Sequence, residues 1–469
     1  MITAIKKEIV RLLCSDKNNI SITFVGSSKN KKIDEISDID VVVVCKTLTK
    51  KYYEEQIKIL RSINKNLYSS KFENIYINNT FGPMKFNKNG NLVIHLMIYD
   101  LKTHKKHVIE SPFTCLDWSL NKASYGLDLK SIYPIVNIQI NDFRNSRRSF
   151  SDYDFEFKEK KLSFREYKFR SNSSYSQVKK YKSIEKIDLI EFMSHVVKFS
   201  IFNLCKFISN ENKLFTNEEV YKILPEFKKF ESLKNKLDRT KSDISLLNEN
   251  EIKKEFKDFL VFFNNYLTKM EKEHEPNVFY FIRHSKTLLN DGSFLGIGRN
   301  PDIKRKINKY RKEEILNLNI SRYFSSPLKR SENTIKQITN RYTLSKNLLE
   351  INYGKVEGMK LNEVNKKFPH IVKSWAKEKD VKFPNGENLN DVKNRLMIFI
   401  KKNMKNIPFI AFTHQVLIRV ALCEAIGLPL NKSFKINIEH EKPYGFFILN
   451  KNIKTTLSRK EIYKIYKHD

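Results

Sequence analysis

Short apolar runs alternate with amphipathic stretches over the last part of the chain, and this alternation most limits what it can fold into. The runs at 277–282, 322–326 and 408–413 are rich in aromatic and β-branched residues, which is typical of buried strands. The stretches between them, such as 389–405, repeat apolar residues with the period of a helix. Strands that alternate with helices predict a parallel sheet between two helical layers, a three-layer α/β fold over 277–469.

Two of these predicted strands end in a histidine. Arg283 and His284 follow the run FYFI, and His414 follows FIAFT. In open α/β sheets, ligands bind at the carboxyl ends of the strands, so both histidines are predicted to lie at such a site. One histidine at a strand end is more often an ordinary surface residue, so a catalytic interpretation depends on the residues that accompany it.

Further motifs accompany the two histidines in a fixed order. The chain reads RHS, then SPLKR ending in Arg330, then LEINYGKVEG with Glu350, then PNGENLNDVKNR, and finally FTHQ. Taken together, this set resembles the histidine phosphatase superfamily, also called phosphoglycerate mutase-like, over about 277–430. The resemblance implies a metal-free phosphomonoesterase that forms a phosphohistidine intermediate.

The resemblance also implies a role for each of these residues. His284 is the expected nucleophile and Glu350 the general acid that protonates the leaving oxygen. Arginine binds phosphate bidentately and keeps its charge, so three side chains are expected around the phosphoryl oxygens: Arg283, Arg330 and His414. Asn290 is an expected further phosphate contact, and Glu357 is interpreted as structural in the glycine turn.

The sequence departs from the family pattern at two positions. Ser285 and Gln415 stand where the family has a glycine after each histidine, a residue that lets the backbone approach phosphate closely. Gln415 adds a side chain near the pocket that can alter substrate choice. No insertion typical of a mutase is evident, so hydrolysis is favoured over transfer between substrates.

The first third of the chain, residues 1–150, contains a second candidate site. Asp38 and Asp40 open the apolar run DIDVVVV, and residues two apart on a strand point to the same side. Two carboxylates held together call for a cation. Gly26 and Ser27 precede them with a tight turn and small side chains suited to a phosphate.

This arrangement resembles the DNA polymerase beta-like nucleotidyltransferase superfamily over about 20–100. The resemblance implies that Asp38 and Asp40 hold two magnesium ions, which bind an NTP and lower the pKa of the attacking hydroxyl. The family usually supplies a third carboxylate from a neighbouring strand. Here His95 occupies the middle of the expected strand and Asp100 its end, so a degenerate nucleotide-binding module and a chance match of the motif are the alternatives.

The region between the two sites, 151–270, is predicted to be a mostly helical domain, a central helical bundle. Thr216 and Glu219 form a capping-box pattern at the start of one helix. The polar, Ser-rich stretch 169–183 is interpreted as a loop or linker, and the charged stretch 271–277 as a domain boundary.

Composition restricts the remaining possibilities. The formal charge of +34 is accompanied by abundant Lys, Asn and Ile, a joint bias typical of an AT-rich genome, and a nucleic-acid-binding regulator is kept as an alternative. The five cysteines show no metal-binding spacing, and no apolar run approaches the ~20 residues of a membrane span. We expect no signal peptide, no membrane partner and a cytoplasmic location with reduced thiols.

The sequence therefore predicts an α/β multidomain protein with two activities. The hypothesis is a metal-independent phosphomonoesterase at the C-terminus and a magnesium-dependent nucleotidyltransferase at the N-terminus, acting on a phosphorylated small molecule and an NTP. The alternative is a phosphatase whose N-terminal domain only binds nucleotide for regulation.

Overall fold

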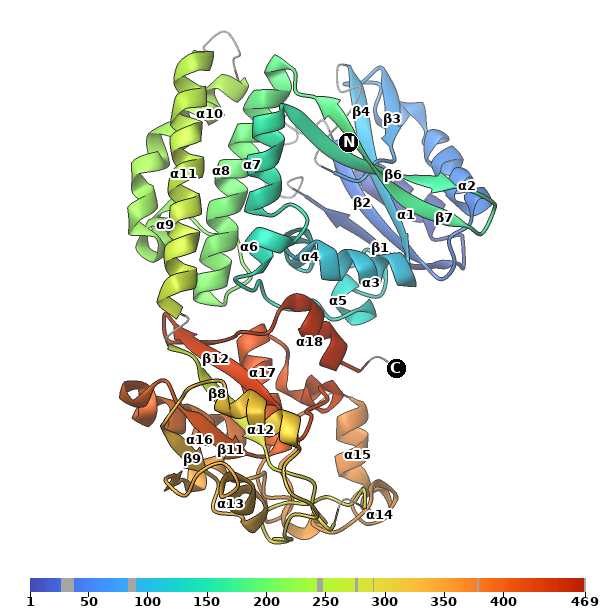
Figure 1. Cartoon of the computed structure of the whole chain (residues 1–469). Helices are drawn as coiled ribbons and strands as arrows, with labels where there is room; N and C mark the ends of the chain where they lie inside the picture. The colour runs from blue at the N-terminus through green and yellow to red at the C-terminus, as the bar shows by residue number, and fades with distance from the viewer. Residues whose placement is uncertain are drawn as a thin grey trace. The chain divides into compact units, whose positions relative to one another are not determined.

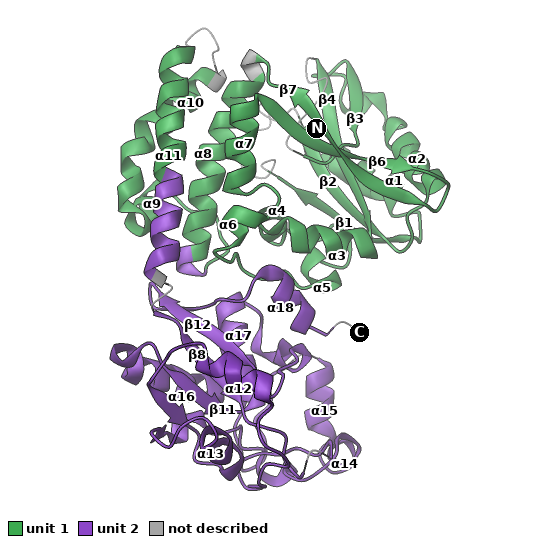
Figure 2. Ribbon diagram, viewed as in Figure 1, with its two compact units in different colours: residues 1–207, 211–262 green, residues 208–210, 263–469 purple. Residues whose placement is uncertain are grey.

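The chain forms two compact units. The computed structural model describes the following residues: 1–26, 38–82, 90–242, 248–274, 277–289, 291–377 and 379–467. The first unit comprises Met1–Phe207 and Glu211–Phe262, and the second comprises Ile208–Asn210 and Phe263–Asp469 (Figure 2). The sequence predicts domain limits at 150 and 270. Whether the segments that these limits separate fold independently stays a prediction.

The first unit contains a mixed five-stranded sheet in the order β3-β4-β2-β1-β5. Strand β2 runs parallel to β4, and β3 is also parallel to β4, whereas β1 is antiparallel to β2. The strands are β1 (Asn19–Val25), β2 (Asp38–Cys45), β3 (Asn74–Asn78), β4 (Asn91–Asp100) and β5 (Tyr125–Gly126). This is an α/β domain, as the alternating pattern of the sequence predicts.

Alternation along β2 divides its side chains between two cores. Ile39, Val41 and Val43 join one core with the apolar faces of helices α1 (Ile2–Leu13) and α2 (Lys50–Arg61). Val42 and Val44 point to the opposite face, where they pack against Met97, Tyr99 and Trp118. Asp38 and Asp40 have the same parity as Val42 and Val44, so the strand directs both carboxylates to this second face.

The interpretation of 169–183 as a loop or linker is wrong. Strands β6 (Lys161–Phe169) and β7 (Tyr175–Ser183) form an antiparallel hairpin (Figure 1). Tyr167, Phe169 and Tyr175 pack against the core that α1 and α2 share with the sheet. Three of the serines lie between the two strands: Ser171, Ser173 and Ser174. The partly buried aromatic side chains on either side of them form the apolar face of the hairpin, which the composition of the stretch did not indicate.

Helices make up the rest of the first unit. They are α3 (Leu101–Glu110), α4 (Pro112–Trp118), α5 (Leu129–Ile132), α6 (Asp142–Asn145), α7 (Phe150–Glu159), α8 (Lys186–Ser209), α9 (Asn217–Ile223), α10 (Glu231–Ser242) and α11 (Glu249–His274), the last of which ends in the second unit. Thr216 and Glu219 form the predicted capping box at α9. Within the described ranges, no helix combines the length and apolar character needed to cross a bilayer.

The second unit is the predicted three-layer α/β fold. Its six strands lie in the order β10-β9-β11-β8-β12-β13, of which the first four are parallel. They are β8 (Phe279–Arg283), β9 (Tyr323–Ser325), β10 (Thr343–Leu344), β11 (Ile410–Thr413), β12 (Pro443–Leu449) and β13 (Asn452–Thr455). The helices are α12 (Lys309–Leu316), α13 (Lys329–Ile335), α14 (Leu361–Lys367), α15 (Pro369–Ala376), α16 (Leu389–Asn403), α17 (Gln415–Ile426) and α18 (Arg459–Ile465).

Two cores hold the layers of this unit together. Ile282 and Phe412 face one side of the sheet, where Ile315 of α12 and Ile335 of α13 cover them. On the other side, Phe281 lies in an aromatic cluster with neighbours from α16 and the strands: Phe279, Phe399, Phe409 and Phe446. With both faces covered, the polar ends of the strands remain as the place for a site.

Candidate active sites

The ends of β8 and β11 bring the two predicted histidines together. Arg283, the last residue of β8, is the register partner of Thr413, the last residue of β11. Because the strands are parallel, His284 and His414 leave the same edge of the sheet, and their ring centroids lie 5.1 Å apart. Both side chains are buried, so the two rings lie inside the domain and not on its surface.

Hydrogen bonds determine which nitrogen of the His284 ring carries the hydrogen. Nδ1 lies 2.7 Å from the carbonyl oxygen of Ser285, which can only accept, so Nδ1 carries the hydrogen. Nε2 then bears the lone pair, and it accepts from Nε of Arg330 at 3.2 Å. Burial, reinforced by Arg330 and Arg283, lowers the pKa of His284 well below its ordinary value. The ring is therefore neutral, and Nε2 carries the lone pair that nucleophilic attack requires.

Arg330 is held in place by backbone carbonyls from a distant loop. Its guanidinium donates to the carbonyl oxygens of Gly296 at 2.9 Å and Arg299 at 3.1 Å. Burial lowers its pKa, opposed by Glu350 and Glu357. Because this side chain is fully buried beside His284, it presents a fixed positive charge to any group bound there.

Glu357 holds that loop, through contacts outside the glycine turn in which the sequence predicts a structural role for it. Its carboxylate accepts from the backbone N–H groups of Ile297, Gly298 and Arg299, at 2.8, 2.8 and 3.1 Å. A Cβ on Gly296 would lie 2.0 Å from the same carboxylate, so only glycine fits there. Glu357 therefore acts on the site through the loop that orients Arg330.

Three buried polar atoms around His284 have no hydrogen-bond partner among the described residues: Nε of Arg283, Oγ of Ser285 and Nδ1 of His414. The other groups of these side chains are anchored. Arg283 donates to the carbonyl oxygen of Ile438 at 2.8 Å, and Nε2 of His414 lies 2.8 Å from the Ser326 hydroxyl. Buried polar atoms without partners are costly, so these three atoms suit a polar ligand.

Glu350 lies in the same buried environment and has the properties of an acid. Its Oε1 accepts from the backbone N–H groups of Ile351 at 3.0 Å and Val416 at 3.2 Å. Burial raises the pKa of this carboxyl, although Arg330 and Arg283 oppose the shift. Arg395, from the motif PNGENLNDVKNR, fixes the segment by donating to the Glu350 carbonyl oxygen at 3.1 Å. A raised pKa favours the protonated form that a general acid needs.

The two departures from the family pattern differ in their surroundings. Ser285 is fully buried, and its backbone N–H donates to the Thr334 hydroxyl at 2.9 Å. Gln415 is half-buried at the first position of α17. The expected phosphate contact Asn290 lies outside the described residues.

His440 is a site residue that the sequence interpretation missed. Its Nδ1 lies 2.6 Å from the His284 carbonyl oxygen, and the two ring centroids are 5.6 Å apart. It precedes β12 and belongs to none of the family motifs. Because 156 residues separate it from His284, only the pairing of β12 with β8 brings it to the site.

The N-terminal carboxylates share one face of β2, but a histidine stands beside them. Asp40 is the register partner of His95 on β4, and Nδ1 of His95 lies 3.0 Å from its carboxylate. Nε2 of His95 lies 2.6 Å from the Thr80 carbonyl oxygen. Gly26 adjoins this pair at φ +81°, where a Cβ would lie 2.2 Å from Asp40 Oδ2. Ser27, the other expected phosphate contact, lies outside the described residues.

Asp100 does not join the two aspartates. It lies five positions beyond His95 on β4, so its side chain points to the opposite face of the sheet. There it caps α3, accepting from the Thr103 backbone N–H at 2.7 Å. His95 thus occupies the position at which the family resemblance predicts a third carboxylate.

Two residues of the N-terminal site, Asp38 and Asp40, have side chains suited to bind a magnesium ion. Asp38 and Asp40 supply hard carboxylate oxygens from one face of β2, which suits magnesium. Throughout the part of the chain that the structure describes, no group of three or more His, Cys, Asp or Glu side chains is placed to hold a metal. The remaining ligands would therefore have to come from the phosphates of a bound nucleotide and from water.

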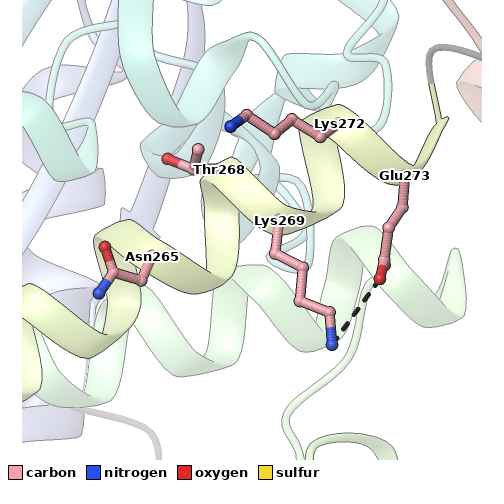
Figure 3. Close-up of a pocket in the computed structure, with 5 residues that line it drawn as sticks. All are labelled: Asn265, Thr268, Lys269, Lys272 and Glu273. Atoms are coloured by element: carbon pink, nitrogen blue, oxygen red, sulfur yellow. Dashed lines mark ion pairs between the residues drawn. The ribbon is translucent and has the colours of Figure 1, made fainter.

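A pocket on α11 is lined by none of the residues described above. Its lining comes from one face of that helix: Asn265, Thr268, Lys269, Lys272 and Glu273 (Figure 3). Lys269 and Glu273 form an ion pair at 3.7 Å across one turn. With no nucleophile and no buried charge, this pocket has the character of a solvated helix face.

Comparison with protein families confirms both resemblances. The model of the histidine phosphatase superfamily (branch 1) matches residues 279–444, and that of the nucleotidyltransferase domain matches residues 6–88. The first match begins in β8 and ends in β12. The chain therefore carries a nucleotidyltransferase domain followed by a histidine phosphatase domain.

Individual relatives resemble the second of these domains. Phosphoserine phosphatase 1 of Hydrogenobacter thermophilus is 28% identical over 171 residues, which cover 34% of this chain and 81% of that protein. Fructose-2,6-bisphosphatase of Saccharomyces cerevisiae is 24% identical over 165 residues, covering 34% of this chain and 36% of that protein. Among solved structures, the alpha-ribazole phosphatase from Shigella flexneri is 17% identical with a TM-score of 0.33, covering 39% of this chain and 96% of that one.

Proposed function

We propose that the histidine phosphatase domain hydrolyses phosphomonoesters through a phosphohistidine on His284. The observation that carries this proposal is the state of that ring. It is buried and neutral, its Nδ1 hydrogen is bonded to the Ser285 carbonyl, and its Nε2 lone pair faces Arg330. Together with the unpaired atoms of Arg283 and His414, these groups suit a tetrahedral anion beside the nucleophile.

The reaction takes place in two displacements. Nε2 of His284 attacks phosphorus, the bond to the ester oxygen breaks, and protonated Glu350 gives its proton to the departing oxygen. Water then attacks the phosphohistidine, the Glu350 carboxylate takes a proton from it, and the N–P bond breaks to release phosphate. Arg283 and Arg330 stabilise the charge on the phosphoryl oxygens in both steps.

This mechanism needs no metal ion, because arginines and imidazoles surround the phosphoryl position. We expect hydrolysis of p-nitrophenyl phosphate to be unchanged by EDTA, and a quenched reaction with labelled substrate to show an acid-labile label on His284. Loss of activity on chelation that magnesium restores would reject the metal-free mechanism.

We propose that the nucleotidyltransferase domain transfers a nucleoside monophosphate from an NTP to a small molecule, with magnesium. Asp38 and Asp40 would hold the metal, which when bound supplies positive charge for the triphosphate and acidifies the attacking hydroxyl. Gly26 keeps the space beside Asp40 clear, since a side chain there would collide with the carboxylate.

One contact favours a second candidate for this domain, a site that binds nucleotide without turnover. His95 contacts Asp40 where a third carboxylate is expected, so the donor set is smaller than that of the active family pattern. Magnesium-dependent release of pyrophosphate from NTPs, measured with candidate phosphorylated acceptors, separates the two. Tight NTP binding without pyrophosphate release would establish the binding role.

A further inference from the structure

The segment that precedes β12 forms a wall of the phosphatase site. The Arg283 guanidinium donates to the carbonyl oxygen of Ile438 at 2.8 Å, and the backbone N–H of Glu441 donates to the carbonyl oxygen of Arg283 at 2.8 Å. His440 lies between these two contacts. The backbone on both sides of His440 is therefore tied to the strand end that carries the nucleophile.

The ring of His440 presents a hydrogen-bond acceptor beside the nucleophile. Its Nδ1 faces the His284 carbonyl oxygen at 2.6 Å, and a carbonyl only accepts, so Nδ1 carries the hydrogen. Nε2 of the neutral ring then bears a lone pair. That atom has no bonded partner in the described ranges, and the ring is half-buried with an edge-to-face approach to His284.

The charges around His440 determine which group this lone pair can bind. Burial and Arg283 lower its pKa to about 4, Lys286 and Arg305 act in the same direction, and the bond to the His284 carbonyl opposes them. The ring is therefore neutral near pH 7 and accepts a hydrogen bond through Nε2. An ammonium donor would be repelled by the same three cations, whereas a neutral hydroxyl would not.

We propose that Nε2 of His440 accepts a hydrogen bond from a neutral hydroxyl on the leaving group, close to the phosphoester, so that polyol and sugar phosphates are the preferred substrate class. The inference rests on the phosphatase function proposed above and concerns the same site. In the Michaelis complex the hydroxyl replaces solvent at Nε2, and the leaving group is oriented along the wall formed by Ile438–Glu441.

The test compares two substrates that differ by one hydroxyl, propane-1,2-diol 1-phosphate and propyl phosphate. The wild type should show the higher kcat/KM for the diol phosphate. This preference is measured on the wild-type protein alone, so it can be tested without a variant. His440→Asn keeps an N–H donor near the position of Nδ1 and removes the acceptor at Nε2. The ratio of the two kcat/KM values should then fall about three- to tenfold, the size of one neutral hydrogen bond.

A matched control is His370→Asn, which makes the same change at an exposed histidine of α15 and should keep the wild-type ratio. Equal kcat/KM values for both substrates in the wild type, or an unchanged ratio in His440→Asn, would overturn the inference while leaving the phosphatase function intact. A preference for O-phosphoethanolamine over the diol phosphate would also overturn it. Failure to hydrolyse any of the three would reject the phosphatase function itself.

Discussion

The two candidate sites differ in the sign of the charge that their side chains carry. Around His284, the side chains include two arginines whose pKa burial lowers and neutral imidazoles, and the Glu350 carboxyl is buried with a raised pKa. In the nucleotidyltransferase domain, Asp38 and Asp40 place two carboxylates on one face of β2, and His95 contacts one of them. The phosphatase residues follow the ends of their strands, whereas the aspartates lie at the beginning of β2.

This difference shows that the two sites depend on ligands to different degrees. Arg330 is oriented by carbonyl oxygens of its own domain, and His284 by the Ser285 carbonyl, so contacts within the domain hold both side chains. Asp40, by comparison, has Nδ1 of His95 at 3.0 Å from its carboxylate. Under the function proposed for this domain, a metal and a nucleotide complete the site, so we expect it to be the more sensitive of the two to loss of a single ligand.

The largest effect is expected from His284→Ala, which removes the nucleophile. Phosphomonoester hydrolysis should fall about 10⁴-fold or more, because no neighbouring group can form the covalent intermediate. Circular dichroism should show the fold retained, and NTP binding should not change. His370→Ala, at an exposed site on α15, is the matched control. If the His284→Ala protein is folded and keeps most of its phosphatase activity, His284 is not the nucleophile.

Glu350→Gln should have the next largest effect, and its size should depend on the leaving group. Alkyl phosphates should lose roughly 10²–10⁴-fold, whereas p-nitrophenyl phosphate should lose much less, because its leaving group barely needs a proton. Equal losses on both substrates would move the acid role to another residue.

The pH profile tests the same assignment. Glu350, whose pKa is raised, is active when protonated, so the rate on alkyl phosphates should fall as pH rises through that pKa. His284, whose pKa is lowered, is active when neutral, so the rate should fall only on acidification below its ordinary range. Glu350→Gln should lose the fall on the alkaline side, and its persistence would point to another acid.

Replacing both Asp38 and Asp40 by Asn should affect only the N-terminal site. Calorimetric titration should show affinity for magnesium-NTP reduced about 10²-fold or more, since both charged ligands are gone. Phosphatase activity should be unchanged. The control Glu54→Gln with Glu55→Gln removes the same charge from the exposed face of α2. Unchanged binding by the double Asn variant would show that DIDVVVV is a structural strand without a site.

The smallest of these effects is expected from Glu357→Ala, which acts through a loop. Loss of the carboxylate frees the backbone N–H groups of Ile297, Gly298 and Arg299, and with them the carbonyls that orient Arg330. We expect kcat/KM to fall about tenfold, with a parallel weakening of inhibition by inorganic phosphate. Glu313→Ala, on an exposed position of α12, should change neither quantity. Weaker catalysis with unchanged phosphate affinity would contradict a role through Arg330.

Much of the fold and of the phosphatase site could be predicted because the signals are local. Apolar periodicity indicated β8, β11 and β2, and strand alternation placed Asp38 and Asp40 on one face. The hairpin of β6 and β7 was missed because its polar residues dominate the local composition. Its aromatic residues become partly buried only when they pack on the sheet, which is a tertiary contact.

By itself, the sequence determined the order of motifs, the strand ends that carry His284 and His414, and the carboxylates that open β2. Only the tertiary structure decided that His95 contacts Asp40, that Asp100 faces away, and that His440 meets the nucleophile. The physical reason is that these contacts join residues far apart in the chain, and strand register, which depends on the packing of whole cores, selects their partners.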